Sequence, residues 1–188
     1  MHRQAEFAII RFMKKIKITR IADELYSLKG FDECGCMGSS CADICCEFGA
    51  DVDKEAYDLI WEHREKIERI GNVRFEDFFE QEWSGDSDFL GGNSIRSRVG
   101  KAGSCIFRLP EQKGCILFKL AAKEQLPRRI IPSICRLFPI TWNNETMEYY
   151  EKENIPAICN CLELGNATAR TVFETQAEAI DDIFEIDI

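Results

Sequence analysis

Ten cysteines give this sequence its clearest chemistry. Five of them cluster near the start of the chain, three stand alone further on, and two form a pair near the end. They are Cys34, Cys36, Cys41, Cys45, Cys46, Cys105, Cys115, Cys135, Cys159 and Cys161. Cysteine thiolates are soft ligands that suit zinc, copper(I) and iron–sulfur clusters. We therefore predict a metal centre and take all ten cysteines as its candidate ligands.

Disulfide bonds are the other common use of many cysteines, and they are typical of secreted proteins. Residues 1–17 lack the pattern of a secretory signal, because the apolar run Phe7–Ile10 is short and charged residues follow it. A chain of 188 residues can also bury a core without covalent cross-links. The adjacent Cys45 and Cys46 are too close for a relaxed disulfide with each other. We therefore expect a cytoplasmic protein that binds metal through thiolates.

The cysteine spacing bears on the kind of metal. A zinc site usually takes four ligands from two short loops, and Cys41 and Cys45 have a suitable separation for one of them. Cys45 and Cys46 are neighbours, so their side chains diverge and more readily reach two metal atoms than one. An iron–sulfur cluster offers several metal atoms and uses four cysteines. We predict an iron–sulfur cluster, with zinc as the alternative.

The overall charge limits the partners. The net charge is −9, and the basic runs are no longer than the pairs Lys14–Lys15 and Arg128–Arg129. Such a chain repels phosphate backbones, so we expect no nucleic acid partner. No stretch approaches the roughly 18 apolar residues of a membrane-spanning helix, so we expect no membrane insertion. The predicted partner is the metal ion or cluster itself, and the sequence indicates no protein partner.

Hydrophobic periodicity predicts an α+β fold with two main helices. Residues 53–70 repeat apolar side chains at helical spacing, with Asp53 as the N-cap and Gly71 at the end. Residues 168–184 show a second amphipathic pattern with Phe173 and Ile180 on its apolar face. Shorter helices are predicted at 75–83 and 118–125. We treat residues 1–188 as a single domain in which these helices flank a cysteine-rich core.

Short strands are predicted between the helices. Residues 104–108 and 115–118 are predicted to pair as a hairpin that carries Cys105 and Cys115 towards the cysteine cluster. Residues 140–142 and 147–150 are predicted to form a second hairpin around a turn of polar residues. Residues 7–21 fit an edge strand or a short helix equally well. The stretch 132–139 is bounded by prolines and is expected to be compact and irregular.

Two segments resemble a known family. One is Gly-Cys-Ile-Leu-Phe at Gly114–Phe118, and the other is Pro-Ser-Ile-Cys-Arg-Leu-Phe-Pro at Pro132–Pro139. With the cluster that ends in Cys45-Cys46, they resemble the YkgJ-like CxxxCxxCC family of zinc- or iron-chelating domains. The likeness covers about residues 30–162. The first motif departs from the family pattern, because four residues separate Cys36 from Cys41.

The resemblance implies a metal-chelating core at about residues 30–162. It also implies that Cys45, Cys46, Cys115 and Cys135 belong to the metal centre, since these positions match the family motifs. Flagellin lysine N-methylases have a similar cysteine pattern and use an iron–sulfur cluster. Three roles remain open: a metal-binding protein without catalysis, an iron–sulfur-dependent enzyme of the methylase type, and an interaction protein with a structural zinc. The sequence indicates no catalytic residue.

Two further residues are candidates for supporting roles. His63 lies on the apolar face of the helix predicted at 53–70, where it would be either a metal ligand or a half-buried, hydrogen-bonded side chain. Arg136 follows Cys135 directly, and it would either donate hydrogen bonds to metal-bound sulfur or form a surface ion pair.

Overall fold

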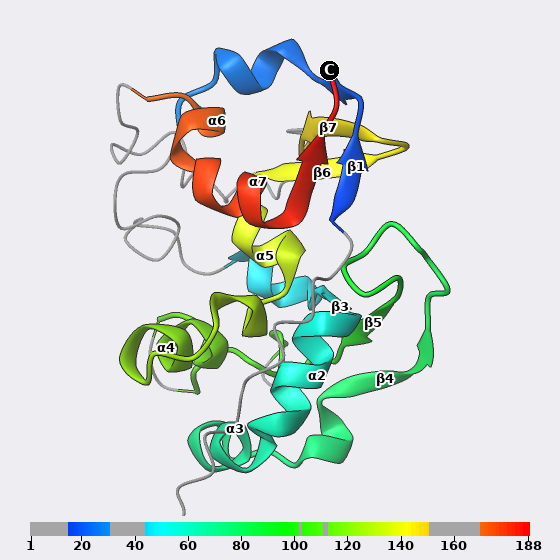
Figure 1. Cartoon of the computed structure of the whole chain (residues 1–188). Helices are drawn as coiled ribbons and strands as arrows, with labels where there is room; N and C mark the ends of the chain where they lie inside the picture. Colours follow the sequence, from blue (N-terminus) through cyan, green and yellow to red (C-terminus); the bar gives the residue numbers. More distant parts are fainter. Residues whose placement is uncertain (1–14, 31–43, 102, 111–112, 151–169) are drawn as a thin grey trace, which may run out of the picture.

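A computed structural model of the chain describes residues 15–30, 44–101, 103–110, 113–150 and 170–188, although not the side chains of Ile44 and Cys45. The described residues form an α+β fold with six α-helices and three small sheets, which confirms the predicted class. Figure 1 shows two groups of elements, one above the other, with helix α5 (Ser133–Leu137) between them. Each group has its own cluster of buried apolar side chains.

The lower group is built on an antiparallel sheet with the strand order β3-β5-β4. These strands are β3 (Asp51–Asp53), β5 (Ser94–Ser97) and β4 (Phe79–Trp83). Three helices belong to the same group, namely α2 (Lys54–Glu62), α3 (Arg64–Gly71) and α4 (Ile116–Lys123). One core of buried apolar side chains holds this group together. It takes residues from the three helices and from the three strands, so α4 shares its core with α2 and α3.

The upper group has two small sheets. Strand β1 (Ile16–Ile18) runs parallel to β8 (Phe184–Ile186), and β2 (Arg20–Ile21) runs parallel to β7 (Thr146–Tyr149). Strand β6 (Ile140–Asn143) completes the second sheet. Helices α6 (Val172–Thr175) and α7 (Ala177–Ile183) and the 3₁₀ helix η1 (Asp23–Tyr26) surround the upper core. The first and last described segments therefore meet in one sheet (Figure 1).

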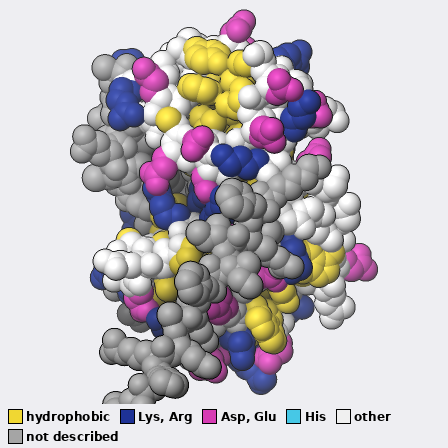
Figure 2. Space-filling model, viewed as in Figure 1, with side chains coloured by type: hydrophobic (Ala, Val, Ile, Leu, Met, Phe, Trp, Pro, Cys, Tyr) yellow, Lys and Arg dark blue, Asp and Glu magenta, His cyan; other side chains and the backbone are white. Residues whose placement is uncertain are grey.

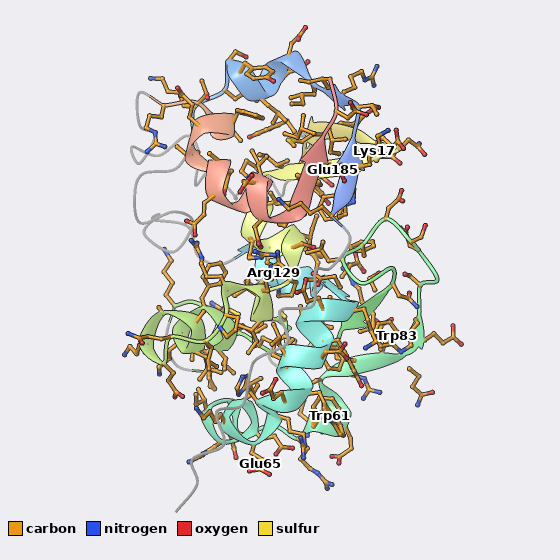
Figure 3. All side chains as sticks on the ribbon, viewed as in Figure 1. Lys17, Trp61, Glu65, Trp83, Arg129 and Glu185 are labelled. Carbon is orange, nitrogen blue, oxygen red and sulfur yellow. The ribbon has the colours of Figure 1, made fainter. Side chains whose placement is uncertain are left out.

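A network of ion pairs joins the two groups. Arg129, in the 3₁₀ helix η4 (Arg128–Ile130), donates hydrogen bonds to Glu55 of α2 at 2.9 Å and to Asp182 of α7 at 2.6 Å. Arg136 of α5 also donates to Asp182. Figure 3 shows Arg129 at the level where the upper helices meet α2. Burial disfavours the ionised carboxylate, but the hydrogen bonds from the two arginines outweigh it and hold the pKa of Asp182 below its usual value.

The helix predicted at 53–70 is confirmed, with a break that the pattern did not reveal. The Asp53 side chain accepts a hydrogen bond from the Ala56 N–H at 3.0 Å, as expected for an N-cap. The helix is interrupted at His63, which ends α2 and precedes α3. Helix α3 ends with Gly71, and Asn72 follows in the left-handed conformation at φ 51°.

Parts of two other predicted helices are strands in the structure. Residues 75–83 form only a short 3₁₀ helix at Phe75–Asp77 and then strand β4, so the prediction of a helix there is wrong. At the C-terminal end, the helix predicted at 168–184 is two helices with a break at Gln176, and Phe184 begins β8. Residues 168 and 169 lie outside the described part. Strand β4 pairs with β5 and β8 pairs with β1, and these distant partners decide the conformation.

The second predicted hairpin is confirmed. Strands β6 and β7 pair antiparallel, with Asn143 opposite Thr146. The two residues between them, Asn144 and Glu145, both have positive φ angles of 47° and 57°. Two consecutive left-handed residues define a type I′ loop, whose twist suits a two-residue hairpin. For residues 7–21, the described portion contains β1 and β2, which supports the strand alternative.

The surface in this orientation mixes both signs of charge. Figure 2 shows Lys, Arg, Asp and Glu side chains interspersed across the face, with a hydrophobic group at its upper end. No helix among the described residues combines the length and apolar character needed to cross a membrane.

Candidate metal centre

The four cysteines whose side chains the structure describes all line one cavity. Its volume is about 600 Å³. The four residues are far apart in sequence and are Cys46, Cys105, Cys115 and Cys135. Each is partly buried. Three of them are positions that the family resemblance assigns to a metal centre, so the fold brings the predicted residues to a common surface.

Cys46 and Cys105 are joined through the backbone. Cys46 lies in the 3₁₀ helix η2 (Ile44–Phe48), and its carbonyl oxygen accepts a hydrogen bond from the Cys105 N–H. Cys105 follows a tight loop after β5 and makes an isolated bridge with Val99. The predicted approach of Cys105 to the cysteine cluster is therefore present at Cys46.

Cys115 reaches the cavity from a different local structure than predicted. It forms an isolated bridge with Arg108, and the Leu109 N–H donates to the Gly114 carbonyl at 2.9 Å. Cys115 is then the N-cap of α4, which begins at Ile116. The predicted strand at 115–118 is wrong, because these residues enter the first turn of a helix. The helix predicted at 118–125 is present and starts two residues earlier.

Cys135 is carried by the short helix α5 instead of the irregular segment that was predicted at 132–139. The Cys135 N–H donates to the Pro132 carbonyl at 2.9 Å. The start of the helix is fixed by Asp53, whose Oδ2 accepts hydrogen bonds from the Ser133 N–H at 2.8 Å and the Ser133 hydroxyl at 2.9 Å. Asp53 therefore holds the N-termini of both α2 and α5, and it positions the helix that presents Cys135.

Ser97 is a site residue that the sequence analysis did not identify. It ends β5, it is 1% exposed, and its hydroxyl oxygen lies 3.4 Å from the Cys105 sulfur. The same oxygen accepts a hydrogen bond from the Ala50 N–H at 2.8 Å. Its position in a strand gives no sequence signal, because the contact arises only when the loop after β5 folds back.

The remaining wall of the cavity is largely apolar. Aromatic residues from different parts of the chain line it, namely Phe48, Phe89, Phe107, Phe118, Phe138, Trp142 and Tyr150. Charged groups also line it: Arg96 pairs with Asp51 at 3.0 Å, and Asp86, Asp88 and Arg108 lie elsewhere on the wall. The cysteines therefore adjoin a space large enough for a small molecule, with both apolar and charged surface.

The four cysteines line this cavity without forming a complete ligand set among the described residues. Among the described residues, no group of three or more His, Cys, Asp or Glu side chains is placed to hold a metal ion. The side chains of the other six predicted ligands are outside the described part of the structure. Cys45 has a described backbone in η2 only, and Cys34, Cys36, Cys41, Cys159 and Cys161 lie outside the described residues.

The two supporting candidates are not among the described residues that line the cavity. His63 is partly buried at the junction of α2 and α3, and it is not among the residues that line the cavity. Arg136 is also absent from that lining, and its side chain is only 5% exposed. It pairs with Asp182 in the network between the two halves, so the surface ion pair considered for it is in fact a buried one.

Comparison with known protein families, with curated proteins and with solved structures finds no match for this chain.

Proposed function

We propose that this protein binds metal through cysteine thiolates, as an iron–sulfur cluster or, alternatively, as zinc. The observation that carries the proposal is the lining of one cavity by Cys46, Cys105, Cys115 and Cys135. They come from four separate segments, and random placement would scatter them over the molecule. No histidine is among the described residues that line the cavity, and soft sulfur donors of this kind suit an iron–sulfur cluster or a zinc site with thiolate ligands.

The donor set fits such a metal in its chemistry. A four-cysteine site uses thiolates alone, and four cysteines are among the described residues that line the cavity. Metal sites rarely exist fully formed before the metal binds, and the binding free energy also stabilises the fold. When bound, an iron–sulfur cluster would supply electron transfer or Lewis acidity, and a zinc ion would supply structural cross-linking.

We also propose that the sequence motifs are those of a YkgJ-like metal-chelating domain. In this proposal the chain is a single cytoplasmic domain with its metal-chelating core at about residues 30–162. Cys45 and the cysteines outside the described residues complete the ligand candidates. We propose the metal as the binding partner, and we propose no binding to nucleic acid or to a membrane.

A second candidate function follows from the size of the cavity. A purely structural metal site is closed by protein ligands, whereas a catalytic centre opens onto a substrate space. Here the cysteines adjoin about 600 Å³ lined by aromatic residues, aspartates and arginines. This arrangement favours an iron–sulfur-dependent enzyme over an interaction protein with a structural zinc. A small-molecule screen by thermal shift on metal-loaded protein separates them, because only the enzyme should gain stability from a ligand of the cavity.

Replacement of single cysteines tests the proposal. We expect Cys115→Ser and Cys135→Ser, each purified without oxygen, to hold less metal per chain than the unaltered protein and to melt at a lower temperature. Thr141→Ser is the matched control, because Thr141 lines the same cavity but has no sulfur. Metal is measured by mass spectrometry of the digested protein. Full metal content in both cysteine variants would contradict the assignment of these ligands.

A further inference from the structure

The Ser97 hydroxyl lies between two cysteine-bearing segments. It accepts a hydrogen bond from the Ala50 N–H at 2.8 Å, four residues after Cys46, and it lies 3.4 Å from the Cys105 sulfur. The Ser97 N–H also donates to the Ala50 carbonyl at 2.8 Å. Ser97 therefore fixes the chain that leaves η2 and contacts the cysteine that follows β5.

The donors and acceptors of the Ser97 hydroxyl bear on which atom donates the hydrogen bond between Ser97 and the Cys105 sulfur. A serine hydroxyl has one proton to donate and two lone pairs that accept. The Ala50 N–H occupies one lone pair, and the side chain is only 1% exposed to bulk solvent. Buried hydroxyl protons are almost always donated, and among the described residues the Cys105 sulfur is the acceptor within reach. A metal-bound Cys105 thiolate carries no proton, so in the metal centre the serine hydroxyl is the donor of this bond.

Glycine at position 49 permits this close approach. Gly49 has φ +69°, and a Cβ atom there would lie 2.5 Å from the Ser97 carbonyl oxygen and 3.2 Å from its hydroxyl oxygen. A larger residue would push the segment after Cys46 away from β5. The local backbone is thus shaped to hold the serine against Cys105.

We propose that Ser97 is a positioning residue of the thiolate metal centre, which acts by donating a hydrogen bond to the Cys105 sulfur. This inference rests on the proposed metal-binding function. The bond fixes the orientation of the Cys105 side chain before the metal arrives. It also withdraws electron density from the sulfur once the metal is bound. Partners that hydrogen-bond to metal ligands commonly change metal affinity by about 10- to 100-fold when they are removed.

Two substitutions of nearly equal shape isolate the hydroxyl. Ser97→Thr keeps it and Ser97→Val lacks it, and both branched side chains suit a strand. Any cost of the added volume is therefore shared. Ser94→Ala is the matched control in the same strand, because Ser94 is 2% exposed and its hydroxyl contacts Ser84 at 2.9 Å, not a cysteine.

The probe is cobalt(II), titrated into the reduced, metal-free full chain without oxygen. Cobalt(II) bound to thiolates gives a sulfur-to-metal charge-transfer band in the near ultraviolet. We expect Ser97→Val to bind cobalt(II) about tenfold more weakly than Ser97→Thr. Its charge-transfer band should lie at longer wavelength, because the sulfur is richer in electrons without the hydrogen bond. Ser94→Ala should match the unaltered protein in both affinity and band position.

The outcomes separate the two proposals. Equal affinity and equal band position for Ser97→Val and Ser97→Thr, with cobalt(II) bound by the unaltered protein, would overturn the role of Ser97 alone. An unaltered protein that shows no cobalt(II)–thiolate band, and that binds neither iron with sulfide nor zinc on reconstitution, would overturn the metal-binding function, and the role of Ser97 with it. Circular dichroism of each variant keeps a failure to fold distinct from a loss of metal. If Ser97→Val does not fold, Ser97→Ala, which lacks the hydroxyl and adds no volume, is compared with Ser94→Ala by the same two measurements.

Discussion

Replacing Asp53 should destabilise the protein far more than replacing an aspartate five residues later. The buried Asp53 carboxylate accepts three hydrogen bonds: one from the Ala56 N–H, one from the Ser133 N–H and one from the Ser133 hydroxyl. The first caps α2, and the other two hold the start of α5. Loss of the carboxylate therefore loosens two helices at once and leaves buried donors without an acceptor.

The expected cost is estimated from the three bonds. An N-cap contributes about 1 kcal/mol, and a hydrogen bond to a charged group contributes about 1.5–3 kcal/mol. Removing the buried charge recovers part of its desolvation cost, so we expect Asp53→Ala to lower the free energy of unfolding by about 3 kcal/mol. Asp53→Asn keeps an acceptor for Ala56 but presents its amide group to the Ser133 N–H, so it should cost about half as much. These are large fractions of the 5–15 kcal/mol that is typical of a domain.

Equilibrium urea unfolding of the reduced, metal-free protein, followed by far-ultraviolet circular dichroism, measures this cost. Asp58→Ala is the control in the same helix. Asp58 is about half exposed, and its ion-pair partner among the described residues is Lys54 one turn away, so its loss should change the free energy of unfolding by no more than about 0.5 kcal/mol. The reasoning would be refuted by equal unfolding free energies for Asp53→Ala and Asp58→Ala with unchanged urea dependence.

Two further predictions concern the same framework. The pKa of Asp182 is lowered in the folded protein, so its ionised form contributes stability above the pKa of an unfolded aspartate, about 4, and this contribution is lost as the pH falls through the lower folded value. Acid unfolding curves of the unaltered protein should thus fall more steeply below about pH 4 than those of Asp182→Asn, and parallel curves would count against the ion network. Gly49→Ala should cost more stability than Gly85→Ala by about 1 kcal/mol or more. Both glycines have positive φ, but only at Gly49 would the new methyl group meet nearby atoms, and thermal melting of the two variants checks the difference.

Local signals were sufficient for some elements of the fold. Asp53 before an amphipathic stretch predicted the start of α2, because an N-cap is decided within one helical turn. The polar turn around Asn144 predicted the β6–β7 hairpin for the same reason. Strand β4 was missed because Phe79 has a helical neighbourhood in sequence and gains its conformation from Ser97 across the sheet. Phe184 was assigned to a helix because the local pattern does not reveal its strand partner, Ile16, which is distant in sequence.

The candidate site was predictable in composition but not in geometry. The cysteines and the motif around Cys135 pointed to a common centre, and four of them line one cavity. Among the described residues, the hairpin expected to deliver Cys115 is reduced to a single antiparallel bridge between Arg108 and Cys115, and Cys115 is the N-cap of α4. Ser97 and Asp182 carried no sequence signal, because their partners come from distant segments that meet only in the folded chain. Hydrogen bonds of this kind follow from tertiary structure and not from local pattern.

The metal content of the unaltered protein tests the central claim most directly. The full chain is purified without oxygen, its iron, acid-labile sulfide and zinc are measured per chain, and its visible absorption is recorded before and after reduction. The account predicts brown protein with stoichiometric iron and sulfide and an absorption that bleaches on reduction. Colourless protein with stoichiometric zinc would leave the assignment of the thiolate ligands unchanged and identify the metal as zinc instead of an iron–sulfur cluster. Protein that holds neither metal, and binds neither after reconstitution with iron and sulfide or with zinc, would contradict the account.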